Sequence, residues 1–161
     1  MKVKQLSLFL ENKPGALSRP VKLLSKAKLN ILTLSIADTR QFGILRFVVR
    51  DWEKAKQLLE KDGCVVKVSD MVAIEVADEP GGLAEILETV EKARVNLEYM
   101  YGFTLKKEGK GVLAFRFDDP DRAIAALQKK GISPVRSVDL FERLEGCAGE
   151  RQETHAVFYE D

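Results

Sequence analysis

The sequence has few of the residues that hold transition metals or form disulfides. Its 161 residues include one histidine, His155, and two cysteines, Cys64 and Cys147, which lie far apart. Zinc and similar ions need about three or four such ligands in a close cluster, and a disulfide framework needs more cysteines than these. We therefore expect a protein without a metal site or cofactor.

Signatures of common enzymes are missing as well. The sequence contains no Gly-x-Ser-x-Gly, His-Glu-x-x-His, P-loop or Gly-x-Gly-x-x-Gly motif. Carboxylates of the expected helices alternate with lysines, which is typical of a solvated face. His155 stands in a polar segment, and no nucleophile pairs with it. We expect no catalytic residues and a protein that is not an enzyme.

Charge of one sign and long apolar runs are lacking too. Lys and Arg number 26 against 25 Asp and Glu, a formal net charge of +1, whereas a nucleic-acid-binding domain usually carries a basic excess. No apolar run approaches the roughly 18 residues that span a bilayer, and the N-terminus lacks the cleavage site of a signal peptide. We expect a cytoplasmic protein with neither a membrane nor a nucleic acid as its partner.

What the sequence does contain is an internal repeat. Three segments of the first half recur in the same order in the second half, and one two-residue insertion within residues 106–110 accounts for the only change of register. The matching pairs are Asn12–Leu17 with Asp78–Leu83, Asn30–Ile31 with Asn96–Leu97, and Gly43–Phe47 with Gly111–Phe115. The chain is therefore a tandem duplication, which we divide into residues 1–70, residues 71–144 and a C-terminal tail, 145–161.

Each copy has the alternation of strands and the spacing of helices that predict the order βαββαβ. This is the ferredoxin-like arrangement of the α+β class, an antiparallel sheet with both helices on one face. The expected strands are Val3–Leu10, Ile31–Ala37, Ile44–Val49 and Val65–Val68 in the first copy, and Met71–Ala77, Leu97–Thr104, Val112–Phe117 and Ser133–Val138 in the second. Helices are expected after each Pro-Gly turn and over Trp52–Lys61 and Pro120–Lys130. Almost no linker separates the copies, so we expect them to pack side by side as one rigid body.

The Pro-Gly turns join a strand to the start of a helix in both copies. Amides at a helix start have no helical partners and attract a carboxylate, while Asn12 or Asp78 could accept a bond from an ammonium group. A free amino acid offers both groups. The alternative is that Pro-Gly only turns the chain. Asn30 and Asn96 are likewise open to two interpretations, as ligand contacts or as left-handed residues that end a helix.

The copies differ in their second strands. Tyr99, Tyr101 and Phe103 alternate in the second copy, where the first copy has small residues. Tyrosines in such positions contact a ligand or, more often, pack in a core. The two sites therefore need not be equivalent.

The strand, the Asn/Asp-x-Pro-Gly-x-Leu segment, the amphipathic helix and the Asn-Ile or Asn-Leu pair together resemble the ACT domain family over residues 1–140. The resemblance implies a non-catalytic regulatory protein whose units pair edge to edge in an eight-stranded sheet. It also implies an amino acid bound between the first turn of one unit and the second strand of another, and an enzyme of amino-acid metabolism as a possible partner. Because exposed sheet edges invite pairing, we also expect a homodimer. The ligand-binding residues would be Asn12, Lys13, Pro14, Gly15, Ala16, Leu17, Asn30 and Ile31, and Asp78, Gly81, Gly82, Leu83, Asn96, Leu97 and Tyr99. Asp78 and Glu79 would repel a carboxylate in the second copy.

An RNA-recognition-like nucleic-acid-binding module is the alternative function, because such modules share the βαββαβ order. Lys110–Phe117 and Leu8–Asn12 resemble their third-strand and first-strand signatures. Base stacking needs aromatic side chains at inner positions of the third strand, however, and the second copy has Val112 and Ala114 there. The regulatory interpretation is therefore favoured.

Overall fold

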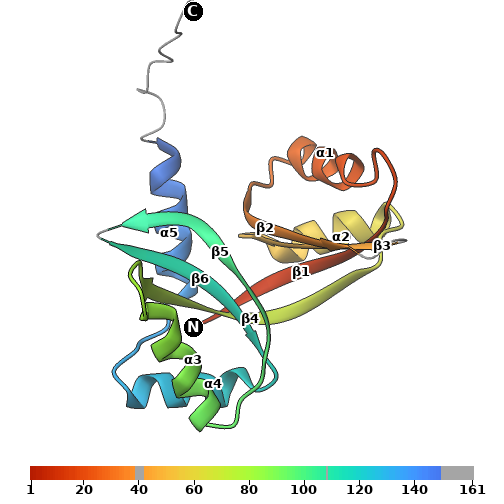
Figure 1. The fold of residues 1–161 in the computed structure, drawn as a ribbon. Helices are drawn as coiled ribbons and strands as arrows, with labels where there is room; N and C mark the ends of the chain where they lie inside the picture. Colours follow the sequence, from red (N-terminus) through yellow and green to blue (C-terminus); the bar gives the residue numbers. More distant parts are fainter. Residues whose placement is uncertain (39–41, 108, 150–161) are drawn as a thin grey trace, which may run out of the picture.

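The computed structural model describes residues 1–38, 42–107 and 109–149. Its elements in chain order are β1 (Lys2–Glu11), α1 (Ser18–Lys26), β2 (Ile31–Asp38), β3 (Phe42–Val49), α2 (Trp52–Lys61), β4 (Val66–Ala77), α3 (Gly82–Lys92), β5 (Leu97–Lys107), β6 (Lys110–Phe117), α4 (Pro120–Lys129) and α5 (Ser137–Gly149) (Figure 1). In this part of the chain, no helix has the length and apolar character needed to cross a membrane.

All strands belong to one antiparallel six-stranded sheet with the order β2-β3-β1-β4-β6-β5. β4 is 12 residues long and serves both units, since its first half pairs with β1 and its second half with β6. The expected strands Val65–Val68 and Met71–Ala77 are therefore one strand. The eight-stranded sheet implied by the family resemblance is wrong for this chain, because sharing β4 removes one strand and the second unit lacks another.

The strand expected over Ser133–Val138 is the one that is missing. Residues 132–136 are irregular, and α5 begins at Ser137. Val135 donates its N–H to the carbonyl of Ala73 at 2.8 Å, so the segment still runs beside β4. Pro134 has no N–H to continue a ladder, which explains why a strand does not form there.

Helix α5 takes the place of that strand because its sequence has helical spacing. The guanidinium of Arg136 donates two hydrogen bonds, of 2.7 and 2.8 Å, to the carboxylate of Asp139. Asp139 lies in the first turn of α5, where a negative charge stabilises the helix. Leu140 and Leu144 follow on one face and are buried. Residues 145–149 form the end of α5, whereas His155 and the apolar stretch 156–159 lie outside the described residues.

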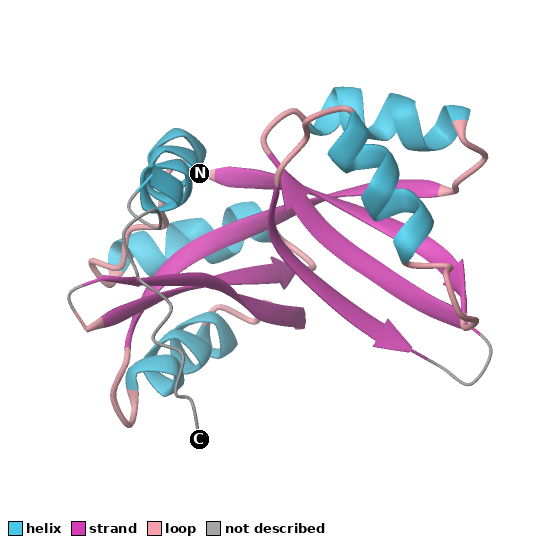
Figure 2. Ribbon diagram, turned by 90° about the horizontal axis from the view of Figure 1, so that it is seen from above, coloured by secondary structure: helices cyan, strands magenta, loops and turns pink. Residues whose placement is uncertain are grey.

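The helices lie on both sides of the sheet (Figures 1 and 2). α1 and α2 cover the outer face of the first unit, with Leu6, Phe47 and Leu59 in its core. α3 and α4 cover the outer face of the second unit, where Phe115 and Phe117 stack at 5.7 Å. The opposite, inner face of the second unit is covered by α5, which packs in one core with residues from all the strands β1–β6.

The ends of the second helix in each unit agree with the sequence prediction. Asp51 accepts a hydrogen bond from the amide of Lys54 at 3.3 Å, and Asp119 accepts one from the amide of Arg122 at 3.0 Å. Gly63 and Gly131 adopt left-handed φ values just after α2 and α4. These caps confirm the helix bounds inferred from Asp and Gly punctuation.

Candidate functional site

The first Pro-Gly turn, which we call elbow one, comprises Asn12–Leu17 and connects β1 to α1. Gly15 has φ +84, a left-handed value that favours glycine. The amides of Gly15, Leu17 and Ser18 have no acceptor among the described residues. All three lie at the amino-terminal end of α1, where the helix dipole adds positive potential. Elbow one is therefore a group of open donors suited to an anionic oxygen.

The second turn, elbow two, comprises Asp78–Leu83 and repeats this arrangement more tightly. The amides of Gly81, Leu83 and Ala84 are equivalent to those of elbow one and likewise have no acceptor in the described part of the chain. A Cβ atom on Gly82 would lie 2.3 Å from the carbonyl oxygen of Ala77. Helix α3 thus starts in direct contact with β4, whereas the residue matching Gly82 in elbow one is an alanine.

Charge separates the two elbows. Elbow one is flanked by both signs: Lys13 pairs with Glu11, and Arg19 pairs with Asp62 at 2.9 Å. Elbow two carries Asp78 and Glu79, and Glu85 follows in the first turn of α3. Asp78, Glu79, Pro80 and Leu83 line a hollow of about 450 Å³ against β4 and β6. A smaller hollow of about 160 Å³ lies on the other side, lined in part by Gly81 and Gly82. A carboxylate is repelled at elbow two and tolerated at elbow one.

Asn30 and Asn96 lie at the far ends of α1 and α3, and both are exposed. Each lines a shallow hollow between its helix end and the following strand. Hollow one, of about 420 Å³, includes Val21, Ser25, Lys28, Leu29, Asn30 and Ile31. Hollow two, of about 440 Å³, includes Leu87, Val90, Glu91, Arg94, Val95, Asn96 and Leu97. The two hollows are equivalent in the repeat.

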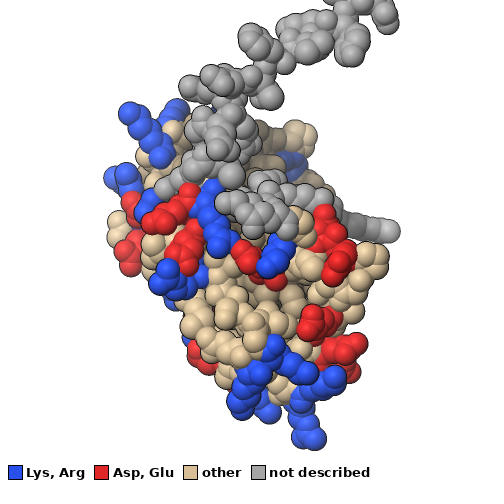
Figure 3. Space-filling view, turned by 90° about the vertical axis from the view of Figure 1, so that its left-hand side faces the viewer, with Lys and Arg blue, Asp and Glu red and all other residues tan. Residues whose placement is uncertain are grey.

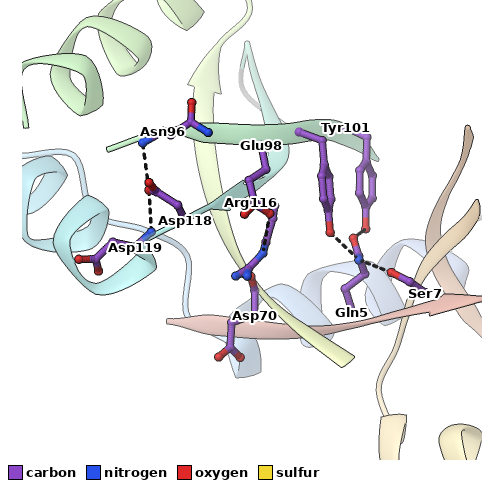
Figure 4. Close-up of polar contacts among 10 residues, drawn as sticks. Gln5, Ser7, Asp70, Asn96, Glu98, Tyr101, Arg116, Asp118 and Asp119 are labelled. Carbon is purple, nitrogen blue, oxygen red and sulfur yellow. Dashed lines mark hydrogen bonds and ion pairs between the residues drawn. The ribbon is translucent and has the colours of Figure 1, made fainter. Parts of the chain in front are cut away.

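The interpretation of the asparagines as left-handed helix ends is wrong. The residues with left-handed φ are Lys28, at +57, and Arg94, at +55. Asn96 instead donates its backbone N–H to the carboxylate of Asp118 at 3.0 Å, and the same carboxylate accepts the N–H of Asp119 at 2.7 Å (Figure 4). The exposed side chains of both asparagines are thus not needed to end their helices.

A family model described as "ACT domain pair" matches residues 1–144. The chain belongs to the ACT domain pair family. A solved structure similar to it is protein BT0572 from Bacteroides thetaiotaomicron, with a TM-score of 0.81 and 35% identity over 88% of this chain and 97% of that one. The resemblance inferred from the Pro-Gly and Asn-Ile segments is confirmed.

One curated relative and one structural neighbour are named as subunits of enzymes. The chain is 32% identical over 88 residues to the acetolactate synthase small subunit of Buchnera aphidicola subsp. Baizongia pistaciae, and this match spans 54% of the chain and 55% of the relative. The regulatory subunit of aspartate kinase from Thermus thermophilus has a TM-score of 0.60 at 15% identity, covering 80% of this chain and 93% of that one. The second likeness shows a shared fold only.

In this ACT pair, the elbows and the asparagines do not meet. Within one unit they lie at opposite ends of the same helix. None of the hollows described above is lined by both an elbow and an asparagine. A site that combines an elbow with an asparagine, as the sequence analysis expects, would therefore need a contribution from another unit.

Tyr99, the remaining expected ligand contact, lies between the two ACT units. Its hydroxyl accepts a hydrogen bond from Nε2 of Gln5 at 2.9 Å, and the guanidinium of Arg46 lies 4.2 Å from its ring centre. Nε2 of Gln5 also donates to Ser7 at 3.0 Å, while Oε1 accepts from Tyr101 at 2.8 Å (Figure 4). This inner-face network joins β1 and β3 to β5.

The sequence analysis missed Gln5, the centre of this network. Gln5 is fully buried, and its one signal in the sequence was that it alternates with Val3 and Ser7 on the strand face opposite Leu6 and Leu8. Burial, reinforced by Tyr99, raises the pKa of Tyr101, while Arg46 opposes this. The Tyr101 hydroxyl therefore stays protonated and serves as a donor.

The inner face of the second unit is not available for stacking bases. α5 packs there, and Val112 and Ala114 are buried beneath it. Figure 3 shows acidic and basic side chains interspersed over one side of the molecule, with groups of Lys and Arg at both its upper left and its lower end. Both observations disfavour the nucleic-acid-binding alternative for this unit.

Proposed function

We propose that this ACT pair is a regulatory protein that binds a small ligand, a free amino acid, on elbow one. The observation that carries the proposal is the set of open amides of Gly15, Leu17 and Ser18, which suits a carboxylate. Asn12 stands beside them and suits the ammonium group. Support comes from the family and from relatives named as subunits of acetolactate synthase and aspartate kinase. An enzyme of amino-acid metabolism is the partner we expect to read the signal.

Elbow one is preferred over elbow two because of the charge around them. The acidic residues Asp78, Glu79 and Glu85 surround elbow two and oppose a carboxylate. We therefore assign one zwitterion to elbow one of each chain.

The site is completed by a second copy of the chain that pairs along the edge of β2, the terminal strand of the sheet in the described part of the chain. β2 also contacts β5, because Thr33 Oγ1 donates a hydrogen bond to the carbonyl of Gly102 at 2.9 Å. Elbow one lies at the same end of the sheet as the end of β2, since both flank the start of β3. Antiparallel pairing of two β2 strands about a two-fold axis would place the start of the partner's β2 beside elbow one. The partner's Asn30 and Ile31 would then face the ligand.

Exposed apolar side chains support this homodimer. Leu34 and Ile36 of β2 are 49% and 53% exposed and lie on the helix side of the sheet, where Leu17 is 38% exposed. An exposed apolar edge strand is a template for pairing with another strand. The L34K/I36K double variant should sediment as a monomer and lose its ligand response. A dimer that survives this change would refute pairing through β2.

The ligand is tested by thermal melting in each of the twenty amino acids. A ligand at about 100 times its Kd stabilises the folded state by about 2.7 kcal/mol, which raises the Tm by roughly 5–10 °C for a chain of this size. Gly15→Leu should abolish the shift. Gly81→Leu is the matched control, because both glycines have left-handed φ and no atom within 4 Å of an added Cβ.

Both variants should lose about 1–2 kcal/mol from backbone strain alone. Only Gly15→Leu should lose the ligand. A response that survives Gly15→Leu and disappears in Gly81→Leu would move the site to elbow two. No shift with any amino acid, together with a shift on adding RNA, would replace the proposal by the nucleic-acid-binding alternative.

A further inference from the structure

The first helices of the two units end differently from the second helices. α2 and α4 are followed by Gly63 and Gly131, which take up the left-handed conformation without steric cost. At the corresponding point after α1 and α3 stand Lys28 and Arg94, the two non-glycine residues with positive φ among those described. Both repeats therefore place a basic residue where glycine is the favoured choice.

This choice costs stability in each unit. A left-handed conformation is unfavourable by about 1–2 kcal/mol for a residue with a Cβ. A basic side chain near a helix C-terminus regains only about 0.3–1 kcal/mol from the dipole. A binding role is a further reason for a basic residue at this position, because Lys28 lines hollow one and Arg94 lines hollow two.

Hollow one combines an apolar wall with a single positive charge. Val21, Leu29 and Ile31 form the apolar part. Ser25 and Asn30 add neutral polar groups, and Lys28 is the one ionisable residue of the lining. Lys28 forms no ion pair within the described part of the chain.

Hollow two has a similar volume but a balanced charge. In its apolar lining, Leu87, Val95 and Leu97 are equivalent to the apolar residues of hollow one, and Val90 is an additional member. Glu91 replaces Ser25, so a carboxylate lines the hollow together with Arg94. An anion attracted by Arg94 is repelled by Glu91, and hollow one alone has a net positive lining.

We propose that Lys28 is a specificity-determining residue, and that hollow one takes a carboxylate carried on a short aliphatic stem. The stem lies on Val21, Leu29 and Ile31, and the carboxylate meets the ammonium group of Lys28. This inference rests on the proposed function, because Asn30 and Ile31 belong to both sites. In the proposed dimer, an amino acid is bound on elbow one of one chain, and its side chain enters hollow one of the partner chain.

The probes for the test are L-glutamate, L-glutamine and glutarate, each titrated calorimetrically into the dimer. Glutamine matches glutamate in shape but lacks the side-chain charge, and glutarate keeps both carboxylates but lacks the ammonium group. We expect glutamate to bind about fivefold more tightly than glutamine, the size of an ion pair at a partly exposed site. Lys28→Gln should remove this preference, and Arg94→Gln should leave it unchanged.

Each outcome decides the inference. Equal binding of glutamate and glutamine, or a preference that survives Lys28→Gln, overturns it, and so does the absence of binding by all three probes. Glutarate binding that depends on Lys28 but survives Gly15→Leu shows that the carboxylate alone is recognised. Other amino acids could raise the Tm of the parent protein and of Lys28→Gln equally. That result would refute the role of Lys28 but would still support the proposed function.

Discussion

Replacing Tyr101 by phenylalanine tests the inner-face network that joins the two ACT units. The Tyr101 hydroxyl donates to Oε1 of Gln5 at 2.8 Å, and Gln5 is 0% exposed. Nε2 of the same amide already donates to Ser7 and Tyr99. Rotating the amide to rescue Oε1 would break both of those bonds. The Tyr101→Phe variant therefore leaves a buried acceptor without a donor.

The expected loss follows from that unsatisfied group. A buried acceptor without a partner costs about 1–3 kcal/mol, which corresponds to a Tm roughly 3–10 °C lower for a chain of this length. Urea unfolding followed by circular dichroism measures the loss as a lower midpoint with an unchanged slope. A midpoint within about 0.5 kcal/mol of the parent protein would refute the network as a stabilising element.

A double-mutant cycle with Gln5→Leu separates the hydrogen bond from other effects. Removing both partners eliminates the unsatisfied acceptor, so the double variant should be more stable than the sum of the single changes predicts. We expect a coupling of about 1 kcal/mol between Gln5 and Tyr101. Additive effects of the two changes would show that their contact contributes nothing specific.

The same side chain predicts a loss of stability in alkaline solution. Burial raises the pKa of Tyr101 in the folded state above that of a free tyrosine. Below the pKa of Tyr101 in the unfolded chain, near 10, its full contribution to the free energy of unfolding is present. This contribution is lost as the pH rises through the pKa of the folded state, because the unfolded chain releases the proton first. Tyrosinate absorbance near 295 nm should show one tyrosine that ionises late. This late step should be absent in Tyr101→Phe.

Three further changes test local features of the fold by urea unfolding. Gly82→Ala should destabilise the protein by about 1–3 kcal/mol, since its Cβ would lie 2.3 Å from the Ala77 oxygen; an unchanged midpoint would refute the close approach of α3 to β4. Lys28→Gly should stabilise by about 0.5–1 kcal/mol by relieving left-handed strain, and a loss of stability would contradict that strain. Asp119→Ala should cost about 1 kcal/mol as a lost cap, whereas no change would show that the cap is dispensable.

The parts of the fold that the sequence predicted are those set by local patterns. The Asp residue before each of α2 and α4 and the Gly residue after it predicted where these helices begin and end. Such signals are local, because a capping side chain and a left-handed φ act within a few residues. The Pro-Gly turns were placed correctly for the same reason. The duplication then supplied what a single copy could not, since each landmark could be checked against its equivalent.

The features that the sequence did not predict depend on contacts between units. Nothing in the alternation around Ser69 and Asp70 distinguishes two short strands from the single long β4. Residues 133–138 match a strand by their place in the repeat, but Pro134 and the helical spacing of Leu140 and Leu144 favour α5. The role of Gln5 emerges only when β5 packs across β1. The left-handed Lys28 was hidden because helix-end rules led us to expect that conformation at Asn30.

The two halves of this ACT pair share strand β4 but differ around their candidate sites. None of the described hollows is lined by both an elbow and an asparagine. α5 covers the inner face of the second unit, and acidic residues surround its elbow. The first unit keeps exposed apolar side chains on β2 and, within the described part of the chain, amides without acceptors at elbow one and a Lys28 without an ion pair. The features on which the proposed ligand site depends are thus concentrated in the first unit, and the proposed two-fold pairing of that unit would give two sites per dimer.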